Sequence, residues 1–206
     1  MVATVVIGYS VRGAPIRAVE VGDPHSPNKA LVVGCIHGDE PAGIAIARRL
    51  EHSSQHGVDL WIIPVLNPDG RAQNTRGNAR GVDLNRNFPW QWRPLGGLFN
   101  SGPRPLSEPE SRSVYRFVRR LRPRVSIWFH QHLDAVDESG GNLAIERRFA
   151  SMSGLRLTRL PREPGSAVGW ENHTLPGSTA FVVELPGGRL SAAGVSRFSR
   201  AVLTVA

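Results

Sequence analysis

The chain has 206 residues, 40% of them hydrophobic and 20% charged, a composition typical of a globular protein and unlike that of a disordered chain. Cys35 is its only cysteine, so an internal disulfide and a cysteine-based zinc cluster are excluded, and metal ligands must be histidines or carboxylates. The formal net charge of +8 comes almost wholly from arginine, because Lys29 is the only lysine.

Charge and hydropathy predict neither a nucleic-acid partner nor a membrane span. The densest basic run, 112–124, falls on a predicted helix whose apolar residues Val114, Phe117, Val118 and Leu121 recur at helical spacing, so its arginines face solvent. No stretch approaches the roughly 18 apolar residues of a membrane helix. The N-terminal residues lack the basic region and cleavage site of a signal peptide, which favours a cytoplasmic protein, unless a signal has been removed.

The first part of the chain predicts four strands and one helix. Val2–Ile7 and Ile16–Val21 are apolar or alternating stretches on either side of a turn-rich segment, which predicts a hairpin. Residues 30–36 form an apolar run typical of a buried strand, residues 40–51 predict a helix, and Val58–Pro64 predicts a fourth strand.

A long segment, 65–106, then shows little periodicity and is rich in Asn, Gly, Pro and Arg. A stretch of about forty residues without its own periodic structure is normally functional or disordered in a compact domain. This one carries aromatic residues and a dense set of polar side chains, which favours a functional loop.

The last part of the chain alternates between helices and strands. Ser107 and Glu110 have the spacing of a capping box, which predicts a helix that starts there and ends before Pro123. The remaining predictions, in chain order, are a strand at Val125–Phe129, a helix at Asn142–Ser153, a loop at Pro161–Pro176, a strand at Ala180–Glu184 and a helix at Ser191–Ala206. This alternation predicts a single α/β domain over residues 1–206, with three α/β/α layers and a mixed, mostly parallel twisted sheet.

His37 and Glu40 are the first candidate site residues, because they follow a predicted strand at the edge where open α/β sheets bind ligands. Zinc accepts imidazole nitrogen and carboxylate oxygen, and its catalytic sites take three protein ligands and one water. The third ligand is expected from the end of the 125–129 strand, which His130 and His132 both follow. Only one of the two histidines can be the partner of His37 and Glu40, because a catalytic zinc site of this kind takes three protein ligands.

Five further polar residues complete the candidate site. Glu184 ends an apolar strand, where a carboxylate is costly to desolvate and where a general base beside a metal would sit. In the long loop, Arg86 with Asn85 offers paired donors that match a carboxylate, and Arg76 offers a cation for a developing oxyanion. Asp83 offers an acceptor for the second ring nitrogen of a metal-bound histidine.

The order and spacing of these motifs closely resemble the zinc carboxypeptidase (M14) family over nearly the whole chain. The matching stretches are His37-x-x-Glu40, Asn67-Pro-Asp-Gly70, Arg76-x-Asn78, Gly81-Val-Asp-Leu-Asn-Arg-Asn-Phe-Pro89, Pro105-Leu-Ser-Glu-Pro-Glu110, His130 and Glu184. The segment after Pro164 looks more like the compact bacterial murein peptide amidases, which cleave the γ-D-glutamyl–diaminopimelate bond of cell-wall peptides.

The resemblance implies the role of each site residue. It implies one Zn²⁺ per chain, held by His37, Glu40 and His130, because bacterial relatives commonly have a proline where His132 stands. It further implies Glu184 as general base and acid, Arg76 as carbonyl polariser, Asn85 with Arg86 as the site of the substrate's terminal carboxylate, and Asp83 as the residue that orients His37. The expected partner is a peptide or muropeptide with a free carboxylate.

Two alternatives and one departure accompany this interpretation. Deacylases of the succinylglutamate desuccinylase or aspartoacylase type share the His-Gly-x-Glu start and an Asn-Arg pair, and they are the main alternative enzymes. A basic binding module with a decayed metal site is the alternative from another class. The family's mobile tyrosine, some twenty residues before the catalytic glutamate, is missing, and the matching region offers Trp170 and His173 instead.

Overall fold

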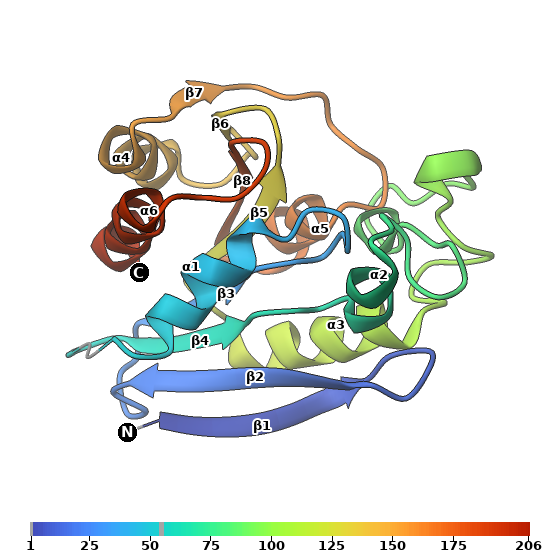
Figure 1. Ribbon diagram of the computed structural model, residues 1–206, viewed down its shortest axis with the longest axis horizontal. Coiled ribbons are helices and arrows are strands. Elements are labelled where there is room, and N and C mark those ends of the chain that lie inside the picture. The colour runs from blue at the N-terminus through green and yellow to red at the C-terminus, as the bar shows by residue number, and fades with distance from the viewer. Residues whose placement is uncertain (1, 54–55) are drawn as a thin grey trace.

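The computed structural model describes residues 2–53 and 56–206, and in this part of the chain eight strands form one mixed sheet (Figure 1). The strands are β1 (Val2–Tyr9), β2 (Pro15–Gly22), β3 (Lys29–Val33), β4 (Asp59–Ile63), β5 (Val125–Gln131), β6 (Ala135–Asp137), β7 (Arg156–Thr158) and β8 (Thr179–Leu185). Their order across the sheet is β1-β2-β4-β3-β5-β8-β6-β7. The four central strands β4, β3, β5 and β8 are parallel, whereas β2 and β6 flank them antiparallel, which confirms the predicted mixed sheet.

Helices cover both faces of this sheet. They are α1 (Ala42–Leu50), α2 (Pro68–Gln73), α3 (Pro109–Leu121), α4 (Leu143–Ser153), α5 (Ala167–Thr174) and α6 (Ala192–Val205), with single 3₁₀ turns η1 (Leu84–Arg86) and η2 (Gly97–Phe99). Helices α1, α4 and α6 pack on one face through side chains such as Ile46, Phe149 and Phe198. Helices α3 and α5 pack on the other through Phe117 and Trp170.

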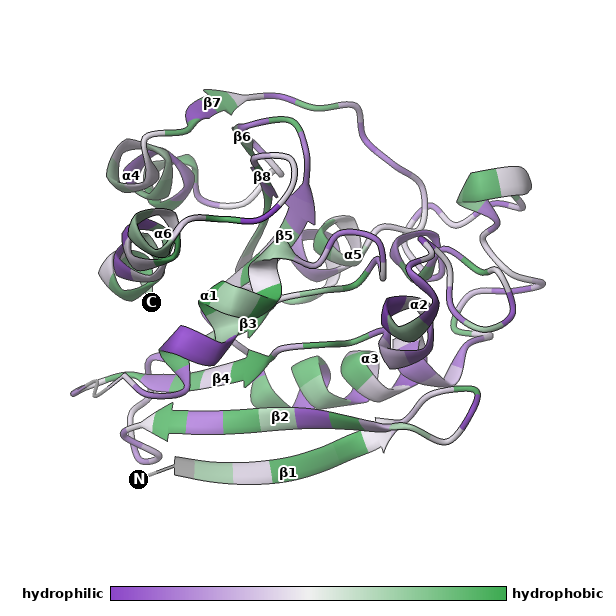
Figure 2. Ribbon diagram, viewed as in Figure 1, coloured by the Kyte–Doolittle hydropathy of each residue, from purple (hydrophilic) through white to green (hydrophobic). Residues whose placement is uncertain are grey.

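Successive side chains of the central strands point alternately to the helices on the two faces of the sheet. Leu31 and Val33 face α3 and α5, whereas Val32 between them faces α1 and its neighbours. A strand buried on both faces has no polar side, which explains why it appears in the sequence as a continuous apolar run. Figure 2 shows hydrophobic residues along the sheet and long hydrophilic stretches in the loops beyond its carboxyl edge. The predicted three-layer α/β/α fold is confirmed.

None of the helices in the described residues is long and apolar enough to cross a membrane.

Several predicted element boundaries were wrong. Helix α5 lies inside the segment 161–176 that was predicted to be a loop, and the three-residue strands β6 and β7 were not predicted. The strand predicted at 30–36 ends at Val33, so His37 stands four residues beyond the strand and not directly at its end. The loop at 65–106 contains α2 and the two 3₁₀ turns.

The predicted capping box at the start of α3 is also wrong. The helix begins at Pro109 with Glu108 as its N-cap, and no side chain in the described residues makes the capping hydrogen bond. The Ser107 hydroxyl donates instead to Glu108 Oε1, 2.8 Å away. Glu110 is fully buried, and its carboxylate accepts from the backbone N–H of Val11 at 3.0 Å. A contact with a residue far away in the sequence thus replaces the local hydrogen bond that a capping box would give Glu110.

The long loop is held in place by asparagine side chains and by close backbone contacts. Asn67 caps α2 by accepting from the Gly70 N–H at 2.9 Å, and Asn78 donates to the carboxylate of Glu108 at 2.8 Å. A Cβ on Gly38 would lie 2.0 Å from the backbone carbon of Gly70, so the turn that carries His37 must have glycine there to pack against α2. The His37-x-x-Glu40 and Asn67-Pro-Asp-Gly70 motifs therefore pack directly on one another.

Candidate metal centre and active site

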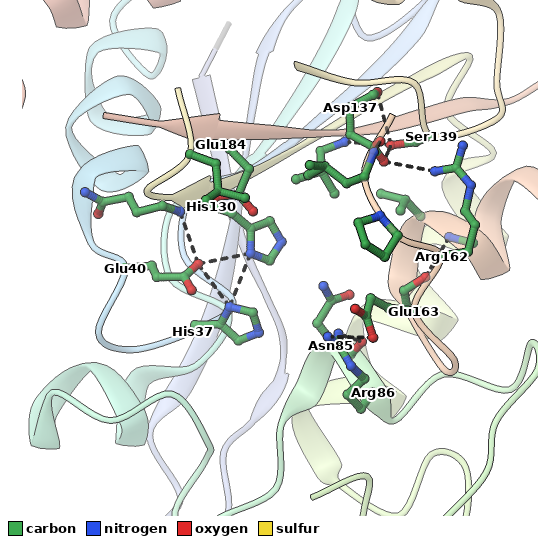
Figure 3. A pocket seen from close by; sticks show the side chains of 18 of the residues that line it. His37, Glu40, Asn85, Arg86, His130, Asp137, Ser139, Arg162, Glu163 and Glu184 are labelled. Carbon is green, nitrogen blue, oxygen red and sulfur yellow. Dashed lines mark hydrogen bonds and ion pairs between the residues drawn. The ribbon is translucent and has the colours of Figure 1, made fainter. Parts of the chain in front are cut away.

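A pocket of about 280 Å³ lies at the carboxyl edge of the central strands (Figure 3). Its walls come from the turn after β3, the ends of β5 and β8, the η1 turn, and the segment that leads into α5. Every residue predicted for the site except Asp83 lines this pocket: His37, Glu40, Arg76, Asn85, Arg86, His130 and Glu184.

His37, Glu40 and His130 meet at one point in this pocket. Nδ1 of His37 lies 3.2 Å from Nδ1 of His130, and the Glu40 carboxylate oxygen Oε2 lies 3.0 Å from each of these two nitrogens. The three donor atoms thus form a nearly equilateral triangle. Zinc bonds of 2.0–2.1 Å in a tetrahedral arrangement separate neighbouring ligand atoms by about 3.3 Å, so the donor set fits zinc in both chemistry and spacing.

Asp83 fixes the ring of His37 for this purpose. Its Oδ1 lies 3.0 Å from Nε2 of His37, so Nε2 carries the proton and the lone pair of Nδ1 is directed toward Glu40 and His130. Burial alone would lower the pKa of His37, but the carboxylates of Asp83 and Glu40 outweigh burial and raise that pKa to about 9. The two histidines in turn hold the pKa of Glu40 well below its usual range, against the opposing effect of burial. A positive charge is therefore strongly favoured at this point.

Glu184 lies beside the triangle because of strand register. Parallel strands β5 and β8 pair His130 directly with Glu184, so both side chains stand on the same face of the sheet. Burial raises the pKa of Glu184, the neighbouring His130 lowers it, and the charge of Glu40 raises it further. Glu184 Oε2 is buried and has no hydrogen-bond partner among the described residues. A proton-accepting oxygen is thus left free within the pocket.

Arg76 contacts both Glu40, a candidate metal ligand, and Asp83, which supports His37. Its Nη1 lies 3.1 Å from Glu40 Oε1, and its Nε donates to Asp83 Oδ2 at 2.9 Å. The guanidinium also lies over the ring of Phe99, 5.3 Å from its centroid. These contacts hold the cation at the rim of the triangle, where it could stabilise negative charge that develops on the carbonyl oxygen of a bound substrate.

Asn85 and Arg86 lie across the pocket, on the η1 turn that Asp83 caps. Asp83 Oδ1 accepts from the Asn85 N–H at 2.9 Å, and Asn85 Oδ1 accepts from the N–H of Ala167 in α5, also at 2.9 Å. Arg86 donates from Nη1 to the Asn85 carbonyl at 3.0 Å, and its Nη2 lies 3.1 Å from the carboxylate of Glu163. Its Nε is buried and lacks a partner among residues 2–53 and 56–206.

Comparison with known proteins agrees with this geometry. A family model described as zinc carboxypeptidase matches residues 1–136, about two thirds of the chain. The chain belongs to the zinc carboxypeptidase family. The matched stretch contains His37, Glu40 and His130 but ends before Glu184, whose placement rests on the pairing of β5 with β8. The fold and the motifs are of the compact bacterial type within this family.

Relatives and solved structures extend the likeness to the whole chain. Bacteriocin BCN5 of Clostridium perfringens is 32% identical over 91% of this chain and 23% of its own length. Murein peptide amidase A of Vibrio campbellii is 31% identical over 64% of this chain and 58% of its own length. The crystal structure of murein-tripeptide amidase MpaA from Escherichia coli O157 superposes with a TM-score of 0.78 at 23% identity, covering 98% of this chain and 90% of that one. The chain thus spans less than two thirds of these curated relatives.

Trp170 and His173, which the sequence offers in place of a mobile tyrosine, take different places. Trp170 is only 2% exposed and stacks on Phe88, so it belongs to the core beneath the pocket. His173 stacks on Trp90 with 3.8 Å between ring centroids, and both rings line the pocket. His132 is exposed at the pocket rim and lies outside the three-residue cluster formed by His37, Glu40 and His130.

Sequence reasoning missed the charged residues on the wall opposite the metal ligands. Arg162 lies 3.0 Å from Asp137, and the neighbouring Glu163 pairs with Arg86 (Figure 3). Asp137 belongs to the unpredicted strand β6, and the two loop residues sit in a segment without periodicity. Only the adjacent opposite charges in Pro161-Arg-Glu-Pro164 marked this segment in the sequence, and such pairs are common on surfaces.

Proposed function

We propose that this protein is a zinc-dependent metallocarboxypeptidase that hydrolyses a peptide or isopeptide bond next to a free carboxylate. We propose further that this bond is the γ-D-glutamyl–diaminopimelate bond of murein peptides and that residues 1–206 act as one catalytic domain. The observation that carries the proposal is the His37–Glu40–His130 triangle, with the partnerless oxygen of Glu184 on one side and Arg86 across the same pocket.

His37, Glu40 and His130 would hold one zinc ion. Such an ion supplies Lewis acidity at the carbonyl of the scissile bond. Glu184 takes a proton from the attacking water, because its raised pKa suits a base that must later return that proton. The same carboxyl group then hands the proton to the leaving amine. Arg76, held at the rim of the triangle by Glu40 and Asp83, donates to the developing oxyanion.

Arg86 and Asn85 select the carboxyl end of the substrate. The guanidinium of Arg86 has paired donors that match a carboxylate, and burial makes such a charged contact strong. A substrate without a free carboxylate next to the bond cannot make this contact with Arg86. This requirement restricts cleavage to the last residue or to an isopeptide bond beside a carboxylate.

The likeness to murein peptide amidase A and to the structure of murein-tripeptide amidase supports the finer assignment of the bond. The test is incubation of the zinc-loaded protein with murein tripeptide and with a panel of peptides that differ at the C-terminal residue, with products identified by mass spectrometry. Each peptide is paired with its C-terminal amide, which removes the charge that Arg86 would bind.

We expect release of diaminopimelate from the murein peptide and no cleavage of the amides. Broad release of C-terminal residues would instead indicate a general carboxypeptidase. Cleavage confined to N-acyl amino acids would favour the deacylase alternative. A protein that holds stoichiometric zinc and cleaves none of these compounds contradicts the proposal.

A further inference from the structure

The guanidinium of Arg86 already holds a carboxylate of this chain. Its Nη2 lies 3.1 Å from Glu163 Oε2, in an ion pair in which the Arg86 side chain is 5% exposed and the Glu163 side chain 46%. Glu163 therefore reaches from the protein surface into the place that the proposed function gives to the carboxylate of the substrate. Figure 3 shows this carboxylate beside Asn85 and Arg86, across the pocket from His37 and Glu40.

We propose that Glu163 is a specificity-determining residue of this enzyme. Before substrate binds, Glu163 forms an ion pair with Arg86. The free carboxylate of the leaving residue then displaces Glu163 from Arg86, and Glu163 pairs with an ammonium group on the side chain of that residue. The inference rests on the proposed function, because it takes Arg86 as the carboxylate site.

Burial explains why the two carboxylates exchange at this position. A buried guanidinium without a partner is costly, so Arg86 must keep one carboxylate or the other at all times. Glu163 is half in water and can leave at low cost, since an exposed carboxylate is well solvated. A substrate carboxylate thus gains the buried contact but must compete for it with Glu163.

The backbone keeps Glu163 next to the pocket after the exchange. Gly165, two residues later, donates its N–H to the Trp90 carbonyl at 3.0 Å and accepts from the Phe88 N–H at 2.9 Å. A Cβ on Gly165 would lie 2.2 Å from the Arg86 carbonyl oxygen, so the two segments are in direct contact. The side chain of Glu163 can swing while its backbone stays in place.

The charges on this wall then favour a cation on the leaving residue. Arg86 with Glu163 and Arg162 with Asp137 form two neutral pairs in the empty pocket. Arg162 also donates to the Glu138 carbonyl, so its guanidinium already has partners when Glu163 leaves Arg86. A leaving residue that brings only a carboxylate adds one negative charge, whereas one that also brings an ammonium group restores neutrality beside Glu163. The preferred leaving residue is therefore a diamino acid.

The test measures binding of two free amino acids to the zinc-loaded protein by titration calorimetry. Lysine and norleucine share the α-carboxylate and a chain of similar length, and only lysine has the terminal ammonium group. We expect the unmodified protein to bind lysine about fivefold more tightly, as a partly exposed ion pair allows. In Glu163→Gln, norleucine should bind about tenfold more tightly than before, because its carboxylate meets no charged competitor, and the preference for lysine should vanish.

Arg162→Gln is the matched control, because it removes the neighbouring ion pair on the same segment without touching Arg86. If it reproduces the change, loosening of the segment explains the result and the inference is wrong. Equal binding of both amino acids to the unmodified protein, or a persistent lysine preference in both Glu163→Gln and Glu163→Ala, also overturns it. Failure to bind either amino acid overturns the carboxylate site itself. Loss of peptide hydrolysis with the binding pattern intact counts only against the proposed function.

Discussion

The two walls of the pocket are built in different ways. One wall, which we call the metal-binding wall after its proposed role, rests on neighbouring parallel strands, and register alone sets His130 beside Glu184. Its proposed metal ligands His37 and Glu40 lie 3.0 Å apart, and Asp83 holds the other ring nitrogen of His37. The opposite wall consists of the η1 turn and the segment before α5, and its outer ion pairs are partly open to water. The groups proposed to react are thus held by more buried contacts than the groups proposed to select the substrate.

This difference assigns the two tasks of a hydrolase to different kinds of structure. Bond cleavage requires a fixed geometry, which packed strands supply. Choice of substrate depends on side chains that can exchange partners, and loops carried on a rigid scaffold supply these. Substitutions on the first wall should therefore change turnover, and those on the second should change binding.

The largest expected effect is that of Glu184→Gln on the metal-binding wall. The amide has nearly the shape of the carboxylate but cannot accept the proton, so kcat should fall about 10³-fold, the usual scale for general base catalysis. Zinc content, measured by atomic absorption, should stay that of the unmodified protein, because Glu184 is outside the ligand triangle. Glu163→Gln is the matched control and should alter KM but leave kcat nearly unchanged.

The pH profile supplies a second readout of Glu184. Burial raises its pKa above the usual 4.5, and a general base works only when deprotonated. Activity should thus be present above this raised pKa and be lost as the pH falls through it. Turnover of metal-replete Glu184→Gln at the level of the unmodified protein would remove Glu184 from the mechanism.

An intermediate effect is expected for Asp83→Asn, which touches both walls. Asp83 Oδ1 accepts from Nε2 of His37 and from the N–H of Asn85, and its Oδ2 accepts from Nε of Arg76. An asparagine amide has only one accepting oxygen and no negative charge, so it keeps only part of this set. Loss of such a supporting carboxylate typically lowers metal affinity 10- to 100-fold. Competition with a chromophoric chelator measures this affinity. Asp137→Asn, a buried carboxylate of the opposite wall, should leave zinc affinity unchanged, and an equal loss in both variants would show a general structural effect.

Sequence reasoning recovered the fold because its main signals are local. The buried strands β3, β5 and β8 appear as short apolar runs, and the helices between them have clear periodicity. Strands β6 and β7 have only three residues each, too few for a pattern. Helix α5 is capped by Ser166, whose side chain accepts from the Gly169 N–H, but the surrounding Gly and Pro residues favoured a loop.

Local signals also account for the site residues that could be predicted. His37, His130 and Glu184 each follow or end a strand, so topology alone brings them to one edge, and their roles remain predictions. The place of Glu163 depends on a tertiary contact with Arg86 that no local pattern records. The capping box at Ser107 failed for a related reason, since buried Glu110 found distant partners that outweigh a local hydrogen bond.

The smallest effect on turnover is expected for Glu171→Gln, beneath the pocket in α5. Glu171 is fully buried, and its Oε1 accepts from the Trp128 indole N–H at 2.8 Å. Burial raises its pKa to about 7 in the folded protein from about 4.5. The folded state therefore favours the protonated carboxyl, which stabilises it below pH 4.5, and this stabilisation is lost as the pH rises through 7.

Glutamine keeps the carbonyl that Trp128 needs but never ionises. Glu171→Gln should therefore match the unmodified protein at pH 4.5 and be more stable at pH 8, by on the order of 3 kcal/mol. Urea unfolding at the two pH values measures this difference. Asp134→Asn, a change at an exposed carboxylate, should show the same stability difference at both. If Glu171→Gln also shows no pH dependence, the carboxyl is solvated, and the core beneath α5 is more open than its burial indicates.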